Sequence, residues 1–307
     1  MRAVVTGAQG FAGRHLCAHL AEAGDEVTAL GREVDVTDRA TLERALAPLA
    51  PDVLYHLAAR THVGASWREP AAFTRANVVG TAAVLAVAER LAPAATVLVV
   101  SSADVYGLVP EDELPARESR RLGPLTPYAR SKVEAERLAR EAAARGLRVV
   151  VVRPFSHTGP GQSLDFVVPA LAARLLEARE RGVLEVPVGD LTPRRDLSDV
   201  RDVVRAYRLA ATLGTTGATY NVASGRDVAV ADVASWLAEQ ILPAARFVRH
   251  EDLVRPVEVP VVRGDVTRLH EATGWEPRID LVATLHDVVA DVAARRALGR
   301  AGDDPLA

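Results

Sequence analysis

The first half of the chain alternates short apolar runs with segments of helical periodicity. Strands are predicted near Val4 and at 27–30, 53–56, 97–101 and 149–152. Helices are predicted at 11–23, 39–48, 70–92 and 127–145. The strand runs are nearly continuous in apolar residues, which is typical of strands buried on both faces. This alternation predicts an α/β fold with a doubly wound parallel sheet, whose ligand site lies at the carboxyl edge of the strands.

The regular alternation of predicted strands and helices ends after Arg153. Beyond it the predicted loops are longer, and Pro and Gly cluster at 154–161 and 187–193. Helices are predicted at 166–181, 199–213, 230–241 and 281–296, with short strands at 184–188, 219–222 and 245–249. We therefore expect a dinucleotide-binding domain over 1–153 and a smaller, mixed α/β substrate-binding cap over 154–296. Part of 199–222 is expected to return to the main sheet, and 297–307 is expected to be a frayed tail.

Composition narrows the classes of partner. The 307 residues carry a formal net charge of -3, which argues against nucleic acid. The single cysteine, Cys17, excludes an intrachain disulfide and is expected to be a buried small hydrophobe. The histidines show no metal-ligand spacing, so no metal is predicted. No apolar run is expected to be long enough to span a bilayer, and no leader is expected before the first strand, so no membrane partner and a cytoplasmic location are expected.

A glycine turn joins the first predicted strand to the first helix. Gly7, Gly10 and Gly13 lie in the run Thr6-Gly7-Ala8-Gln9-Gly10-Phe11-Ala12-Gly13. Gly7 permits the tight turn, Gly10 lets a pyrophosphate approach the backbone, and Gly13 lets the helix pack close to the strand. The helix N-terminus then offers free N–H groups to phosphate. The spacing is GxxGxxG, so the turn alone is weak evidence for a dinucleotide site.

Two further elements supply candidate chemistry. Tyr128 and Lys132 lie four residues apart on a predicted helix, and therefore on one face. A neighbouring ammonium is expected to lower the pKa of the Tyr128 phenol and to make it a general acid–base group. Ser102 follows the fourth predicted strand, at the functional edge of the sheet, where its hydroxyl is suited to polarise a carbonyl.

In this order, the glycine turn, the strand-end serine and the Tyr-x-x-x-Lys helix resemble the extended short-chain dehydrogenase/reductases that act on nucleotide sugars. Leu57-Ala58-Ala59, Asn77-Val78-Val79-Gly80-Thr81 and Asp35-Val36 also look like motifs of that family. The resemblance covers nearly the whole chain and implies a Rossmann fold, an NAD(P) cofactor, a catalytic set of Ser102, Tyr128 and Lys132, and a Lys132 that also bonds the nicotinamide ribose. The implied cofactor-binding residues are Gly7, Gln9, Gly10, Phe11, Gly13, Arg32, Asp35, Val36, Leu57, Ala58, Ala59, Asn77, Tyr128, Lys132 and Pro154.

The second half resembles GDP-4-keto-6-deoxy-D-mannose reductases within that family. The resemblance is carried by residues 153–162, 166–169, 195–202 and Arg255-Pro256. It implies substrate contacts from Val63, Ser102, Asp104, Ser156, Arg195 and Arg255. Arginine forks suit the pyrophosphate of a sugar nucleotide, although an ion pair of Arg195 with Asp196 or Asp199 is the alternative. Ser156 stands where the family usually has a substrate-contacting Asn.

The expected reaction is hydride transfer from NAD(P)H to the C4 ketone of a nucleotide-linked 4-keto-6-deoxy sugar. Asp104 stands where related 4,6-dehydratases place a Glu base, and it is one methylene shorter, which favours reduction. A 4,6-dehydratase, a 4-epimerase and a non-catalytic NAD(P)-sensing protein remain alternatives. Arg32 favours NADP, while Glu33 and Asp35 leave NAD open. A homodimer through the helices at 70–92 and 127–145 is also expected from the resemblance.

Overall fold

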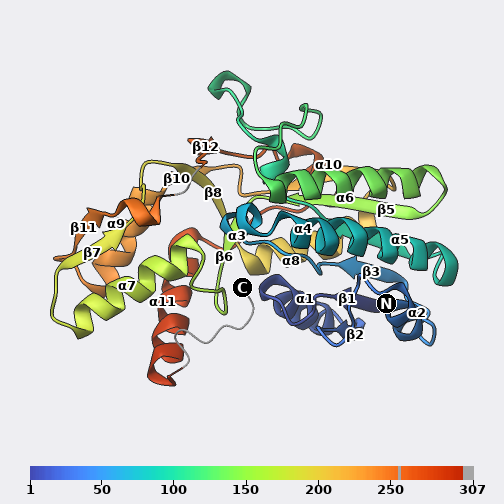
Figure 1. The fold of residues 1–307 in the computed structure, drawn as a ribbon, viewed down its shortest axis with the longest axis horizontal. Coiled ribbons are helices and arrows are strands. Elements are labelled where there is room, and N and C mark those ends of the chain that lie inside the picture. Colours follow the sequence, from blue (N-terminus) through green and yellow to red (C-terminus); the bar gives the residue numbers. More distant parts are fainter. Residues whose placement is uncertain (255–256, 300–307) are drawn as a thin grey trace.

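Six parallel strands form the central sheet of the protein (Figure 1). The computed structural model describes residues 1–254 and 257–299. The strand order is β2-β1-β3-β4-β5-β9. The strands are β1 (Arg2–Thr6), β2 (Glu26–Leu30), β3 (Val53–His56), β4 (Thr96–Val100), β5 (Arg148–Pro154) and β9 (Thr219–Val222).

The order of the strands reverses at β1, which has β2 on one side and β3 on the other. Thr6 is in register with Leu30 of β2 and with His56 of β3, so the three strands end level. The loops that follow β1 and β3 therefore leave the sheet in opposite directions and open a crevice between them. This is where a doubly wound sheet binds its ligand.

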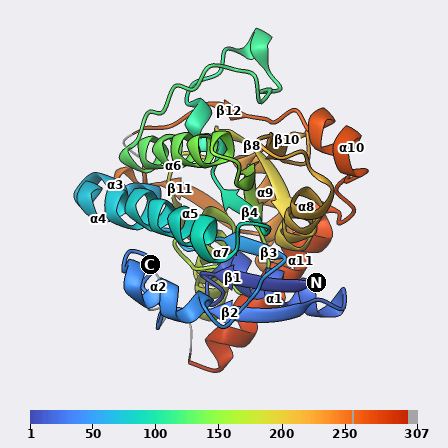
Figure 2. The same ribbon diagram turned by 90° about the vertical axis from the view of Figure 1, so that its right-hand side faces the viewer.

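Helices cover both faces of the sheet, which explains why its strands are apolar on both sides (Figure 2). One face packs against α1 (Phe11–Glu22), α8 (Val200–Leu213) and α10 (Thr267–Thr273). The other packs against α2 (Arg39–Leu46), α5 (Gly80–Leu91) and α6 (Pro127–Ala144). The strand and helix predictions for the first half are confirmed, apart from α3 (Val63–Arg68), which the sequence pattern did not predict.

The predicted helix at 70–92 is a continuous run of three pieces. It consists of α4 (Pro70–Phe73), the π-helical turn η1 (Thr74–Val79) and α5. By length and hydropathy the run Pro70–Leu91 is sufficient to cross a membrane, so the expectation that no apolar run reaches that length is wrong. Half of its most apolar window is buried inside the protein, and buried core helices of soluble proteins share this composition.

The cap, at the left of Figure 1, is built around β8 (Arg194–Asp199). Strand β8 pairs with β6 (Ser156–Thr158), β10 (Asp227–Ala229) and β12 (Val261–Val262). A separate parallel pair, β7 (Glu185–Val188) and β11 (Arg246–Arg249), packs with α7 (Val167–Glu180), α9 (Val230–Ile241) and α11 (Leu281–Ala297). Short 3-10 turns lie at η2 (Ala103–Tyr106), η3 (Glu111–Glu113) and η4 (Glu251–Leu253).

Several segments of the second half pack against the main sheet. Strand β9 pairs with β5, as expected for part of 199–222. Leu269 of α10 and the fully buried Trp275 also belong to the core between the sheet and helices α1 and α8. The sequence placed both within the cap, because a local pattern does not show which core a short apolar segment joins. Of the expected tail at 297–307, residues 300–307 lie outside the described part of the chain.

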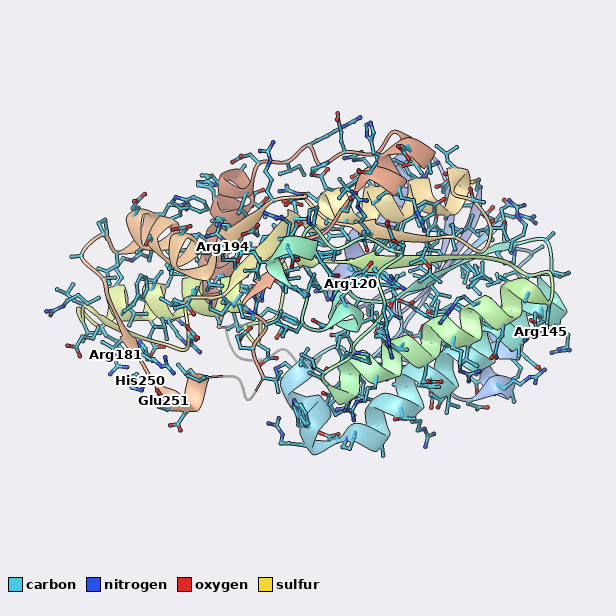
Figure 3. All side chains as sticks on the ribbon, turned by 90° about the horizontal axis from the view of Figure 1, so that it is seen from above. Arg120, Arg145, Arg181, Arg194, His250 and Glu251 are labelled. Atoms are coloured by element: carbon cyan, nitrogen blue, oxygen red, sulfur yellow. The ribbon has the colours of Figure 1, made fainter. Side chains whose placement is uncertain are left out.

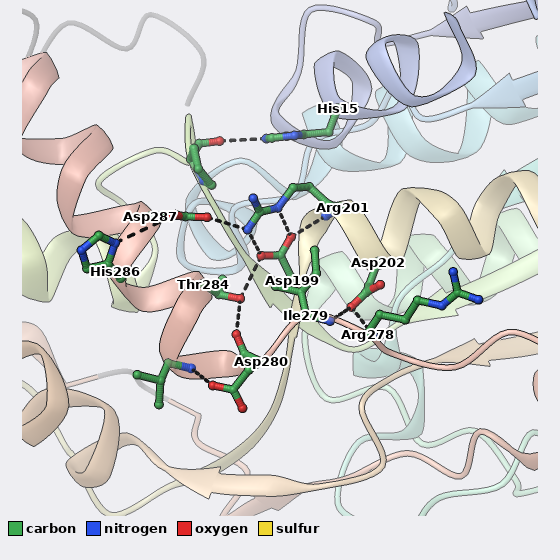
Figure 4. A network of polar contacts seen from close by, with 12 residues as sticks. His15, Asp199, Arg201, Asp202, Arg278, Ile279, Asp280, Thr284, His286 and Asp287 are labelled. Atoms are coloured by element: carbon green, nitrogen blue, oxygen red, sulfur yellow. Dashed lines mark hydrogen bonds and ion pairs between the residues drawn. The ribbon is translucent and has the colours of Figure 1, made fainter. Parts of the chain in front are cut away.

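A polar network ties the cap to the sheet (Figure 4). His15 of α1 hydrogen-bonds the Pro160 carbonyl at 2.8 Å. Arg201 of α8 pairs with Asp199 and with Asp287 of α11, at 2.7 Å in each case. These contacts fix the cap over the strand ends, so residues from both halves face the same crevice.

The arginines are spread over the whole molecule (Figure 3), where Arg120, Arg145, Arg181 and Arg194 lie far apart. Cys17 is half-buried and packs against the core beside α1 and α8. Trp236 packs against the cap core. Trp67 is 45% exposed and lies on α3, the helix that the sequence pattern missed.

Candidate active site

A cavity of about 1120 Å³ runs along the carboxyl edge of the sheet and continues under the cap. Its lining includes the glycine turn, the ends of β3 and β4, the start of α6 and the facing side of the cap. All of the predicted site residues line it except Asn77 and Arg255. Arg255 lies outside the described residues, so its predicted phosphate contact is not placed.

The glycine turn has the geometry that close approach of a ligand requires. Gly7 has φ +69°, and a Cβ there would lie 2.7 Å from the Ala58 nitrogen. A Cβ on Gly13 would lie 2.9 Å from the Ala8 Cα. A Cβ on Gly10 would meet only the Gly7 carbonyl within 4 Å, at 3.2 Å. A side chain at Gly10 would thus crowd the turn at the helix start, where Gly10 lines the cavity, so these residues fit the close approach of a dinucleotide pyrophosphate.

The end of the cavity nearest β2 carries a cationic side chain. Arg32 and Asp35 are exposed and line it. The Glu33 carboxylate instead accepts hydrogen bonds from the Gly31 nitrogen at 2.7 Å and from Gln9 Nε2 at 3.4 Å. The acidic residue beside Arg32 is thus engaged with Gln9 of the glycine turn, while the Arg32 guanidinium and the Asp35 carboxylate both line this end of the cavity.

The candidate catalytic groups lie on two adjacent elements. Thr126 caps α6 by accepting a hydrogen bond from the Ala129 nitrogen at 3.0 Å, and this fixes the helix start that carries Tyr128. Lys132 follows one turn later and donates to the Val100 carbonyl at 3.0 Å. Its Nζ lies 6.0 Å from the centre of the Tyr128 ring. Ser102 follows β4, where its hydroxyl accepts a hydrogen bond from the Asp104 nitrogen at 3.2 Å, and it lines the same cavity as Tyr128. The structure therefore brings the three predicted residues together.

The protonation of this group differs from the sequence-based expectation. Burial raises the pKa of Tyr128 above its usual value, the Asp104 carboxylate raises it further, and the nearby Ser102 hydroxyl opposes both. The expectation that Lys132 by itself brings the Tyr128 pKa down is wrong, because desolvation of a phenol that is 6% exposed outweighs an ammonium 6.0 Å from its ring. A protonated Tyr128 is the form that a general acid requires.

Lys132 is 5% exposed, and burial lowers its pKa from 10.5 to about 8. The Glu136 carboxylate, one turn further along α6, opposes that shift. Lys132 is also the only lysine among the 307 residues, in a chain that uses arginine at every other cationic position. An amine responds to burial in a way that a guanidinium does not, which fits a functional role at this one position.

Of the predicted substrate contacts, Val63 and Asp104 line the cavity from the segments after β3 and β4, and Ser156 and Arg195 line it from the cap. Arg195 forms an ion pair with Glu258 and donates to the Val259 carbonyl at 2.8 Å. Its expected alternative partners are engaged elsewhere. Asp196 accepts hydrogen bonds from the Ser224 nitrogen and hydroxyl at 2.6 Å, and Asp199 pairs with Arg201. The alternative ion pair with an aspartate is thus wrong, and Arg195 stays at the cavity wall.

Asn77 does not reach the cavity, although the resemblance placed it among the cofactor contacts. It is 1% exposed within η1. Its amide donates to the Arg60 carbonyl at 3.0 Å and to Ser131 Oγ at 2.9 Å, and its oxygen accepts from the Arg60 nitrogen at 2.8 Å. Asn77 therefore fixes the loop after β3 against α6, because a buried amide must satisfy its hydrogen bonds within the protein.

His157 also lines the cavity, but its ring is held by the protein. Its Nδ1 lies 2.9 Å from the Phe155 carbonyl oxygen, and its ring stacks on Phe11 with the ring centres 6.0 Å apart. Sequence reasoning missed Arg174 of α7 and Glu258, which also line the cavity. No spacing signal marks either, since both reach the cavity only through the packing of the cap. Among the described residues, no cluster of three or more His, Cys, Asp or Glu is placed to hold a metal ion.

Fold and site together define a dinucleotide-dependent oxidoreductase of the extended short-chain dehydrogenase/reductase class. The chain belongs to the NAD dependent epimerase/dehydratase family, whose model matches residues 3–223.

The similar proteins include several that act on sugar nucleotides. GDP-6-deoxy-D-mannose reductase of Pseudomonas aeruginosa is 37% identical over 299 residues, covering 96% of this chain and 98% of that protein. The structure of RMD from Pseudomonas aeruginosa complexed with NADPH matches with a TM-score of 0.88 and 36% identity, covering 96% of this chain and 98% of the other. The UDP-glucose 4-epimerase of Thermotoga maritima, solved with UDP-glucose, matches with a TM-score of 0.87 and 27% identity, over 97% and 100% of the two chains.

Proposed function

We propose that this protein reduces the C4 ketone of GDP-4-keto-6-deoxy-D-mannose with NADPH. One observation carries the proposal: a single cavity joins the glycine turn, the Ser102–Tyr128–Lys132 group and the cap residue Arg195. Such a cavity accommodates a dinucleotide along the sheet edge and a second, phosphate-bearing ligand under the cap. The Pseudomonas aeruginosa relative supports GDP as the nucleotide and NADPH as the reductant.

The residues have separate tasks in this reaction. Hydride donation to C4 is the chemistry that a bound reduced nicotinamide supplies. Tyr128, kept protonated by burial, gives its proton to the C4 oxygen as negative charge develops there. Ser102 donates a hydrogen bond to the same oxygen and stabilises it. The Lys132 ammonium stabilises the phenolate that remains on Tyr128 after the transfer.

A 4,6-dehydratase is the second candidate, because Asp104 also lines the cavity and its carboxylate acts electrostatically on Tyr128. dTDP-glucose 4,6-dehydratase of Neisseria meningitidis is 29% identical over 84% of this chain. A dehydratase or a 4-epimerase regenerates its nicotinamide internally, whereas a reductase consumes NADPH with every turnover.

The test is loss of NADPH absorbance when purified protein meets GDP-4-keto-6-deoxy-D-mannose. We expect one NADPH oxidised per ketone reduced, with the C4 configuration of the product read by NMR. Tyr128→Phe is expected to lower kcat at least 100-fold while leaving NADPH binding within about threefold, because it removes only the acidic proton. A native rate in this variant, or no consumption of NADPH by the native protein, would overturn the proposal.

The proposal includes a homodimer, a cytoplasmic location, and no nucleic-acid or membrane partner. Support for the dimer comes from α5 and α6, which pack side by side on one face of the sheet and leave Val79 47% exposed at the start of α5. The net charge of -3 supports the absence of nucleic acid.

A further inference from the structure

Beneath the three candidate catalytic residues lies a buried ion pair that the proposed reaction does not use. Glu136 of α6 and Arg153 of β5 pair at 2.7 Å, with side chains 2% and 6% exposed. Arg153 Nε donates to Glu136 Oε1 at 2.8 Å, so the pair is bidentate. A bidentate guanidinium fixes the orientation of a carboxylate as well as its charge.

The same carboxylate also holds the end of β4. Ser101 donates its hydroxyl to Glu136 Oε1 at 2.6 Å. Ser101 is the residue before Ser102, and Lys132 donates to the carbonyl of the preceding residue, Val100. Glu136 and Lys132 thus hold two consecutive residues at the strand end, Val100 and Ser101, against one face of α6, directly before Ser102.

Arg153 extends the network to the cavity wall. Its Nη1 donates to the Tyr106 hydroxyl at 2.9 Å and to the Glu118 carbonyl at 3.2 Å. The Tyr106 hydroxyl donates to Asn221 Oδ1 at 2.6 Å. The ends of β4, β5 and β9 and the turn η2 are therefore connected through one buried ion pair.

We propose that Glu136 is a positioning residue for the reduction: it fixes the β4 end that carries Ser102 against the helix that carries Tyr128 and Lys132, and it places a negative charge one turn from Lys132. This inference rests on the proposed function. The charged and titratable groups that bear on Lys132 are Tyr128 and Glu136 on its own helix and His56 of β3. Behind them, Arg153 of β5 pairs with Glu136, and Asp104 of η2 acts on Tyr128. Burial and the Lys132 charge hold the pKa of His56 at about 3, so that ring stays neutral. Glu136 is the group that opposes the effect of burial on the Lys132 pKa.

The single lysine makes the proposal directly measurable. In protein labelled with ¹³C at the lysine ε-carbon, one signal reports Lys132, since the chain has no other lysine. Its titration gives the Lys132 pKa without any turnover. In Glu136→Gln we expect this titration, and the alkaline limb of the NADPH oxidation rate, to move to lower pH by about one pH unit. We expect kcat to fall 10-fold or more, with less than a threefold change in the KM of the sugar nucleotide.

Ser101→Ala distinguishes the positioning of the β4 end from the effect of the Glu136 charge on Lys132. It removes the hydrogen bond from Ser101 to Glu136 and leaves the Glu136–Arg153 ion pair intact. We expect its kcat to fall at least threefold while the Lys132 titration stays at its native pH. Glu134→Gln is the matched control, since Glu134 lies on the same helix and pairs with Arg137 at the surface; it should leave both readouts native. If Glu136→Gln does not fold, the kcat of Ser101→Ala tests the proposal: a reduced kcat supports the positioning role and a native kcat overturns it.

A folded Glu136→Gln with a native Lys132 titration overturns the proposal, as does a native kcat in Ser101→Ala. If the native protein oxidises no NADPH, the proposed function fails, and NADPH affinity replaces kcat as the second readout. A native NADPH affinity in Ser101→Ala then overturns the positioning role.

Discussion

Replacing Lys132 with methionine tests the cost of keeping an ammonium in this site. Burial lowers the pKa of Lys132 from 10.5 to about 8. At 1.36 kcal/mol per pH unit, the buried charge destabilises the folded protein at pH 7 by roughly 3 kcal/mol. Methionine has a similar length and carries no charge, but it leaves the Val100 carbonyl without its 3.0 Å hydrogen bond, a loss of about 1–2 kcal/mol. We therefore expect Lys132→Met to be more stable than the native protein by about 1–2 kcal/mol at pH 7, and to lose most reductase activity.

The difference in stability between Lys132→Met and the native protein is expected to shrink as the pH rises. The folded pKa lies below the unfolded one, so the unfolded chain binds more protons between about pH 8 and pH 10.5. The native protein therefore gains stability from this group as pH rises through that window, and the variant does not. Paired denaturant titrations at pH 7 and pH 9.5 should show the gap closing. Arg137→Met, at an exposed site on the same helix, should show no such change. Equal or lower stability of Lys132→Met at pH 7, or a gap that does not change with pH, would refute the reasoning.

Two other predictions concern the cofactor and the assembly. Arg32→Asp should reverse the coenzyme preference, raising the KM for NADPH at least tenfold and that for NADH less, because it replaces a cation with an anion where the 2′-phosphate is expected; an unchanged preference would assign the 2′-phosphate to another residue. Light scattering at micromolar concentration should give twice the mass of 32.7 kDa, and a monomer would exclude a stable dimer through α5 and α6.

Local sequence determined the elements that carry the cofactor side of the site. The glycine turn can be recognised from local sequence alone, because the positive φ at Gly7 and the close approach at Gly13 require residues without a Cβ. Tyr128 and Lys132 share a face because of helical periodicity alone. The alternating apolar runs likewise predicted five of the six strands of the sheet, since strands buried on both faces leave a continuous apolar signal.

The cap was less predictable, because its short strands carry no strong period. Strand β8 contains Arg194, Arg195, Asp196 and Asp199, whose polarity conceals a strand that is largely buried. Those charges are tolerated because each is paired or hydrogen-bonded by residues distant in sequence, such as Ser224 for Asp196. Only the tertiary structure shows such partners.

The sequence by itself thus determined the class of fold, the glycine turn proposed to hold the dinucleotide and the identity of the three groups proposed to meet the ketone. Only the tertiary structure decided the protonation states of these groups and the buried contacts that hold them in place. The phenol stays protonated because neighbouring elements remove it from water, and the amine is tuned by the same burial together with the Glu136 charge. Desolvation depends on what surrounds a side chain in space, and the linear order of residues does not record that.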